Sequence, residues 1–214
     1  MELRLESQVR TTDGLAGTLA DVVIDPAKKS VTHVVVRAGE PDPAARLVPL
    51  QLVRGGNAPG EPVSLSCTAE ELGQLESVQG YAYLPVDERP APDAQWDVGV
   101  EDVVMMPSYQ GADLGVYTAD IEPNVGVTYD RVPKGEVELR RSSAVVSSDG
   151  HDLGTVHSVA VDAGAIAHVA VERGHLWWKG LVSVPIGSVT ALETNAVTVG
   201  LTKDAFSKLP KQKS

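Results

Sequence analysis

The chain has 214 residues, enough for one or two domains of ordinary size. Hydrophobic residues make up 43% and charged residues 22%, which is typical of a globular protein and excludes a chain too polar to fold. The net charge of −11 argues against direct binding of nucleic acid or of an anionic membrane, because both need clustered lysine and arginine.

The N-terminal residues alternate charged and apolar side chains from Glu2 onward and lack the basic and apolar regions of a secretion signal. No run approaches the roughly 18 apolar residues of a membrane helix, so we expect no membrane insertion. Cys67 is the one cysteine and has no partner for an internal disulfide. These features predict a cytoplasmic location.

Two stretches of the chain share an ordered series of turn and strand signals. Asp13-Gly14 corresponds to Asp149-Gly150, and Pro49 corresponds to Pro185, both at an offset of 136 residues. His-Val steps and Gly-Thr pairs occur between these markers in the same order in both stretches. The sequence therefore predicts an internal duplication.

Each copy has the signals of a small β structure. An Asp-Gly pair between β-rich runs predicts a hairpin, because glycine accepts positive φ without penalty. Runs rich in β-branched residues follow in each copy, at 19–25 and 31–36 in the first. Proline removes a backbone donor, so Pro49 and Pro185 predict an edge strand or a bulge. Five or six strands in about 65–70 residues are typical of a small barrel or sandwich.

Each copy also ends with a helix signal. Thr68 is followed three residues later by Glu71, the arrangement of a capping box, and then by Leu72. Thr202 and Phe206 repeat the pattern without the glutamate. We expect a short helix that plugs one end of the barrel at the end of each copy.

The segment between the copies matches neither of them. Residues 81–140 hold twelve acids and four bases, and six prolines interrupt any long helix. Apolar residues such as Trp96 and Tyr129 are too frequent for a solvated linker, so we expect an acidic, partly ordered connector that packs on the barrels. The expected domains are a first barrel at 1–80, the connector at 81–135, a second barrel at 136–210 and a mobile tail at 211–214.

These residues resemble the PRC-barrel family, named for the cytoplasmic domain of the photosynthetic reaction-centre H subunit. The family also includes the C-terminal domain of a ribosome maturation factor. The resemblance rests on the two Asp-Gly turns and on these motifs: His33-Val34-Val35-Val36, Val48-Pro49-Leu50, His168-Val169, Gly174-His175-Leu176-Trp177 and Val184-Pro185-Ile186. The sequence departs from the pattern at Trp178, where relatives tend to have glycine.

The resemblance implies an all-β fold of two small PRC-type barrels in tandem, each with a short terminal helix, in a bacterial protein. It leaves most of 81–128 uncovered. The family uses its barrels for contacts with other proteins and shares no catalytic residues that could be carried over. Fold alone does not imply function.

Motifs of enzymes are absent from the sequence. There is no phosphate-cradling glycine loop, no nucleophile elbow and no zinc-protease helix, so we expect no catalytic residue, cofactor or metal ligand. The five histidines show no helical metal spacing, and the equivalence of two of them in the repeat indicates a structural role. They are His33, His151, His157, His168 and His175.

Three aspartates and the cysteine could be taken for binding or reactive residues, but local structure accounts for them more simply. Asp149, Asp152 and Asp162 lack the ligand spacing of a calcium loop, and turn formation accounts for them. Cys67 precedes the helix start at Thr68, where a helix N-terminus can lower a thiol pKa. A lone cysteine after a strand is more often a small buried hydrophobic residue.

The candidate contact site is the loop that contains His175, Leu176, Trp177, Trp178 and Lys179. Neighbouring side chains of an extended segment point to opposite faces, so one tryptophan packs inward while the other reaches a neighbour. Tryptophan is enriched at interface anchors. The alternative is that the loop packs on the other barrel or on the connector.

The sequence thus predicts a non-catalytic cytoplasmic adaptor or scaffold that binds an unidentified protein, or a second copy of itself, through barrel loops and edges. The acidic connector would steer a basic partner. Two other functions remain open: a regulatory protein that binds a small ligand or metal, and an assembly factor for ribosomes or RNA processing.

Overall fold

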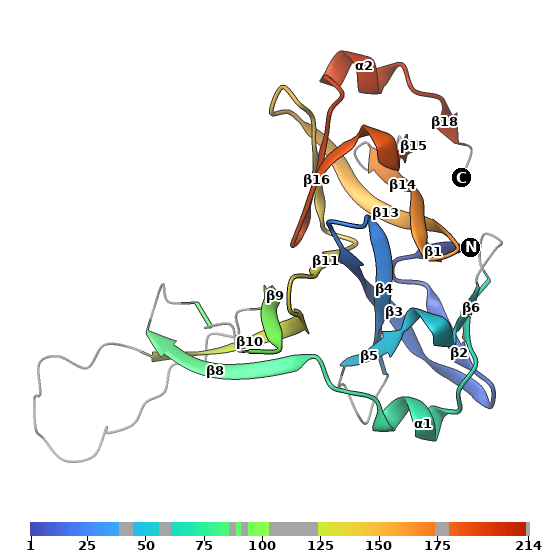
Figure 1. Ribbon diagram of the computed structural model, residues 1–214, viewed down its shortest axis with the longest axis vertical. Coiled ribbons are helices and arrows are strands. Elements are labelled where there is room, and N and C mark those ends of the chain that lie inside the picture. Colours follow the sequence, from blue (N-terminus) through green and yellow to red (C-terminus); the bar gives the residue numbers. More distant parts are fainter. Residues whose placement is uncertain are drawn as a thin grey trace, which may run out of the picture. The chain divides into compact units, whose positions relative to one another are not determined.

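Strands dominate the structure (Figure 1), a computed structural model that describes residues 1–38, 45–55, 61–85, 89–90, 94–102, 124–173 and 180–212. The chain divides into two compact units, one of Met1–Val78 with Gly135–Ser214 and the other of Gln79–Lys134. The first unit therefore contains both copies of the repeat. Within the described residues, no helix has the length and apolar character needed to span a membrane.

The first copy forms a curled sheet with the strand order β5-β4-β3-β2-β7-β6. The β2–β7 pair is parallel, and the other pairs are antiparallel. Its elements in chain order are β1 (Glu2–Arg4), β2 (Gln8–Thr11), β3 (Gly14–Asp25), β4 (Ser30–Arg37), β5 (Ala45–Pro49), the 3-10 turn η1 (Leu50–Leu52), β6 (Val53–Gly55), β7 (Val63–Leu65) and α1 (Ala69–Gln74).

The second copy repeats this arrangement with the strand order β15-β14-β13-β12-β17-β16, and β12–β17 is again the parallel pair. Its elements are β11 (Val137–Arg140), β12 (Ala144–Val146), β13 (Asp152–Asp162), β14 (Ala165–Arg173), β15 (Gly180–Pro185), η2 (Ile186–Ser188), β16 (Val189–Glu193), β17 (Ala196–Val199), α2 (Lys203–Ser207) and β18 (Lys211–Gln212). The duplication in the sequence is therefore also a duplication of strand order.

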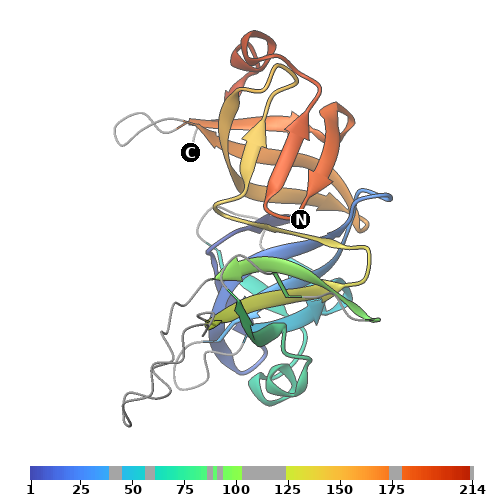
Figure 2. The ribbon, with the colours of Figure 1, turned by 90° about the vertical axis from the view of Figure 1, so that its left-hand side faces the viewer.

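The strands of each copy form a curled sheet, as Figure 2 shows for the second copy (orange). The buried apolar residues of both copies belong to one hydrophobic core. Within the described residues the first sheet ends at β5 on one side and at β6 on the other, joined by η1. The structure thus shows a β-rich, curled mixed sheet. Both predicted hairpins are confirmed, because β2 pairs with β3 and β12 pairs with β13 around the Asp-Gly turns.

Two glycines allow the long strands β3 and β13 to bend next to their partners. Gly17 and Gly154 have φ values of +144° and +131°, which disfavour any residue with a side chain. A Cβ atom at Gly17 would overlap the carbonyl oxygen of Arg37, and one at Gly154 would overlap that of Glu172. The two copies therefore use the same close backbone approach at equivalent positions.

The two copies exchange their first strands. β1 leaves the first copy and pairs antiparallel with β13 of the second, while β11 pairs antiparallel with β3 of the first. Leu3 and Leu139 of the exchanged strands are fully buried. A third link joins β4 to β14, where the Val31 amide donates to the Gly164 carbonyl at 3.0 Å. These pairings make the two curled sheets one continuous unit.

Both terminal helices follow the capping signals in the sequence and lie at opposite ends of the first unit (Figure 1). The Thr68–Glu71 capping box is present at α1. At α2 the Thr202 side chain accepts a hydrogen bond from the Ala205 amide, without a reciprocal glutamate. The predicted short helix at the end of each copy is thus confirmed.

After the terminal helix, the chain returns to the sheet in the same way in both copies. Lys211 and Gln212, expected to lie in the tail at 211–214, pair with β15. In the first copy Ser77 forms a β-bridge with Arg46 of β5, and β5 is the strand that corresponds to β15. The tail thus begins with two residues of β structure.

The second unit, at Gln79–Lys134, has a sheet of its own. Its strands are β8 (Gln79–Pro85), β9 (Trp96–Asp102) and β10 (Asn124–Pro133), with β10 in the middle and antiparallel to both. Trp96 is buried, and the Arg131 guanidinium lies 4.9 Å from the centre of its ring. The described part of the expected connector is therefore more regular than an extended linker.

Candidate functional site

The predicted contact residues His175, Leu176, Trp177, Trp178 and Lys179 lie outside the described residues. The strands that flank them are well defined, since Arg173 at the end of β14 pairs with Gly180 at the start of β15. The Arg173 guanidinium lies 5.6 Å from the ring centre of Phe206, which is fully buried in α2. The end of β14 at Arg173 therefore lies next to α2.

The described histidines have separate structural surroundings. His33 and His168 occupy equivalent places, each paired across the sheet with the proline that ends the next strand, Pro49 or Pro185. His151 is exposed, with Nε2 3.9 Å from Asp149. In the described part of the chain no potential metal-binding group contains a histidine.

One of these histidines lies beside the exchanged strand β11. The His33 Nδ1 atom is 3.7 Å from the Glu136 carboxylate, and the Thr32 hydroxyl donates to the same carboxylate oxygen at 2.6 Å. These three residues line an open groove of about 740 Å³ with Lys28 and with Gly164 of the second copy. This groove at the junction of the copies is a candidate ligand site.

The aspartates of the two Asp-Gly turns are helix caps. Asp13 Oδ1 accepts hydrogen bonds from the Thr11 hydroxyl at 2.7 Å and from the Ala69 amide at 3.0 Å. Asp149 Oδ1 accepts from the Lys203 amide at 3.1 Å. The hydrogen bond from Thr11 lowers the pKa of Asp13 below its usual value. These contacts account for both aspartates without a bound cation.

Cys67 is buried, and its carbonyl accepts the amide hydrogen of Thr12 at 3.0 Å. Burial raises the pKa of its thiol above the ordinary value. A raised pKa leaves less thiolate at neutral pH, so the interpretation as a small buried hydrophobic residue fits this environment better than that of a reactive thiol.

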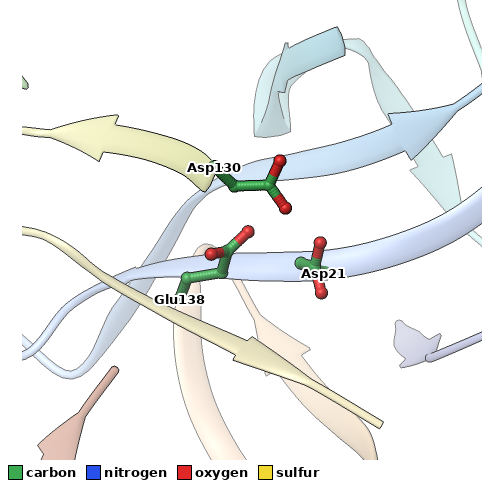
Figure 3. Close-up of side chains that lie close together, drawn as sticks. All are labelled: Asp21, Asp130 and Glu138. Atoms are coloured by element: carbon green, nitrogen blue, oxygen red, sulfur yellow. The ribbon is translucent and has the colours of Figure 1, made fainter. Parts of the chain in front are cut away.

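The exchanged strands bring acidic side chains into the buried junction of the copies. On β1, Glu2 accepts a hydrogen bond from the Ser158 hydroxyl of β13 at 2.7 Å. At the equivalent place, Glu138 of β11 lies near Asp21 of β3, with carboxylate oxygens within 4.8 Å (Figure 3). The Arg140 Nε donates to Asp21 Oδ1 at 3.1 Å, and this cation offsets part of the negative charge. Figure 3 also draws Asp130, which belongs to β10 of the second unit.

Arg141, directly after β11, connects the two copies. Its guanidinium contacts Glu172 and the Nδ1 atom of His157, both in the second copy. Its Nε lies 3.9 Å from Glu6 of the first copy. Burial lowers the pKa of Arg141, although the Glu6 charge acts in the opposite direction. The junction is therefore held by charged groups as well as by backbone pairing.

These junction residues were not identified from the sequence, although a signal for them was present. Glu2-Leu3-Arg4 and Glu138-Leu139-Arg140 are identical tripeptides at the same offset of 136 residues as the turns and prolines. This match shows that each copy begins with the exchanged strand. It does not show which sheet the strand joins.

Neither a scan against models of protein families nor a search of curated proteins gave a match for this chain. The resemblance to the PRC-barrel family therefore rests on the sequence motifs themselves.

Proposed function

We propose that the chain is a tandem PRC-barrel-type protein that acts as a non-catalytic adaptor in the cytoplasm and presents its loops to a protein partner. The observation that carries the proposal is the exchange of β1 and β11 between the two curled sheets. Exchange of strands fixes the two copies as one platform, and loops on a fixed platform lose less conformational entropy on binding.

The loop after β14 is the first candidate contact surface on this platform. Its ends are fixed by the Arg173–Gly180 pair and by the contact of Arg173 with Phe206. Two adjacent tryptophans in such a loop supply a large apolar contact area with few rotatable bonds. A partner that covers Trp177 or Trp178 would gain affinity chiefly from this burial.

The test is affinity purification of the protein from its native host, with Trp177→Ala/Trp178→Ala compared with wild type. Tyr81→Ala is the matched control, because it removes an aromatic side chain that is 59% exposed elsewhere. We expect a specific protein that is retained by wild type and by Tyr81→Ala and lost from the double variant. Circular dichroism must show that all three are folded. Absence of any specific protein with wild type would contradict the adaptor function.

Binding of a small ligand is the second candidate, favoured by the groove of about 740 Å³ beside His33 and Glu136. Its volume lies within the range of ligand pockets, about 300–1,000 Å³. Thermal unfolding in the presence of metal ions and small organic acids would test this function. A saturable rise in the melting temperature that Glu136→Gln abolishes would support it.

A further inference from the structure

We propose that a second cavity, at the junction of the two copies, binds the phosphate group of a small organic molecule. The cavity has a volume of about 320 Å³. It is lined by Glu6, Thr18, Leu19, Ala20, Asp21 and Arg37 of the first copy and by Arg140, Arg141 and Ser142 at the end of β11. This proposal does not depend on the adaptor function.

The cavity gathers positive charge in a chain whose net charge is −11. Its lining has three arginines, Arg37, Arg140 and Arg141, and two carboxylates, while Arg141 also contacts Glu172 outside the lining. Arg4 adds a fourth positive charge close enough to Arg141 to act on its pKa. The buried Nε of Arg4 has no hydrogen-bond partner among the described residues. Positive charges that share one lining repel one another, so a bound anion would stabilise the cluster.

The two carboxylates of the lining differ in how firmly they hold their cations. Asp21 is almost fully buried and accepts from the Arg140 Nε at 3.1 Å, which is a fixed structural pair. The Glu6 side chain is 72% exposed and lies 3.9 Å from Arg141, a distance at which solvent screens most of the attraction. A ligand anion can therefore replace Glu6 at the Nε side of Arg141 at low cost, while the terminal nitrogen of Arg141 keeps its contact with Glu172.

The chemistry of the lining favours phosphate over other anions. The planar guanidinium group presents paired N–H donors that match two oxygens of a phosphate. The hydroxyl groups of Thr18 and Ser142 lie in the same lining and can donate to a third oxygen. A volume of about 320 Å³ lies at the lower end of the range for ligand pockets, which indicates a small organic phosphate and not a free ion alone.

The test is isothermal titration of the full chain at low ionic strength with glycerol 3-phosphate, inorganic phosphate, succinate and glycerol. We expect saturable binding of glycerol 3-phosphate, weaker binding of inorganic phosphate and succinate, and none of glycerol. Equal affinity for glycerol 3-phosphate and inorganic phosphate would overturn the assignment of an organic ligand. Absence of saturable binding by any phosphate would overturn the site.

Three variants locate the binding. Arg141→Gln should weaken glycerol 3-phosphate binding by about tenfold or more, because it removes the guanidinium whose Nε lies 3.9 Å from the exposed Glu6. Glu6→Gln should strengthen binding by about two- to threefold, because it removes the competing carboxylate. Arg10→Gln is the control, since Arg10 is exposed, lies outside the lining, and its loss changes the net charge equally. A loss with Arg10→Gln equal to that with Arg141→Gln would overturn the proposal.

A measurement on the wild-type protein covers the case in which Arg141→Gln does not fold. The ¹⁵N resonances of the arginine Nε groups are followed by NMR while glycerol 3-phosphate is added. We expect the signals of Arg37, Arg140 and Arg141 to shift along one saturation curve while that of Arg10 stays in place. Shifts spread equally over all arginines would show non-specific binding and contradict the site.

Discussion

The carboxylate of Asp13 accepts the amide hydrogen of Ala69 at 3.0 Å, although the two residues lie 56 positions apart in the chain. Ala69 is the first residue of α1, so this bond satisfies one of the amide groups that a helix start leaves open. Asp149 and Lys203 form the same bond in the second copy. The Asp-Gly turn of each copy therefore fixes the start of its terminal helix.

Asp13→Ala should lower the melting temperature by a few degrees, because it removes the acceptor for both Thr11 and Ala69. Asp13→Asn keeps one acceptor oxygen and should have a smaller effect. Asp162→Ala removes an exposed aspartate at the end of β13 and should leave the melting temperature unchanged. Differential scanning calorimetry gives all three values. Equal losses for Asp13→Ala and Asp162→Ala would show that the bond to the helix is unimportant.

Stability should also fall in acid because of these aspartates. Hydrogen bonds donated by Thr11, Lys28 and Ser147 lower the pKa of Asp13, Asp25 and Asp149, respectively. A pKa that is lower in the folded state gives stability that is fully present above the unfolded value of about 3.9 and is lost as the pH falls further.

The measurement is the urea midpoint of unfolding at pH 7, 4 and 3. Wild type should lose stability between pH 4 and pH 3, and the variant Asp13→Asn/Asp149→Asn should lose less over the same interval. A parallel loss in both proteins would assign the acid sensitivity to other carboxylates.

Gly154→Ala should destabilise the protein by about 2 kcal/mol or more, or prevent folding. The added Cβ would meet the Glu172 carbonyl while the backbone stays in a conformation that alanine disfavours. Gly17→Ala should behave alike, because its environment is equivalent. Gly187→Ala is the control, since a Cβ there meets nothing within 4 Å. Chemical denaturation checks the values, and a neutral Gly154→Ala would show that β13 does not bend as described.

Leu139→Ala should cost about 2–5 kcal/mol of the free energy of unfolding, which is the usual cost of truncating a fully buried leucine. Leu139 lies on the exchanged strand β11, and the loss should therefore weaken the junction of the copies. Leu3→Ala on β1 should cost a similar amount. Leu15→Ala, where the side chain is 59% exposed, should be nearly neutral. If limited proteolysis cleaved Leu139→Ala and Leu15→Ala equally fast, the role of β11 in the junction would be excluded.

Cys67 should react slowly with iodoacetamide in the native protein, because burial limits access and raises the thiol pKa. In 8 M urea the same thiol should react at the rate of a free cysteine. Mass spectrometry of the alkylated protein at several times gives both rates. A native rate equal to the rate in urea would place Cys67 at an accessible surface.

Local signals in the sequence determined much of the fold. The Asp-Gly turns and the β-branched runs predicted hairpins and strands correctly, because glycine and branched side chains restrict the backbone wherever they stand. The edge strand expected at the prolines is found at β5, which ends at Pro49, whereas β15, which ends at Pro185, pairs with both β14 and β18. Thr68 and Glu71 placed the start of α1, since a capping box needs contacts over three residues alone. The offset of 136 residues showed that there are two copies.

The tertiary structure alone decided which edges pair. Backbone amide and carbonyl groups are the same on every strand, so β1 could equally have paired with a strand of its own copy. The sequence does not show that β1 pairs with β13 of the second copy. The junction follows from that choice, because strand exchange brings Arg141 of the second copy within reach of Glu6 of the first. The sequence by itself determined the elements of each copy, and long-range strand pairing determined the charged cavity between them.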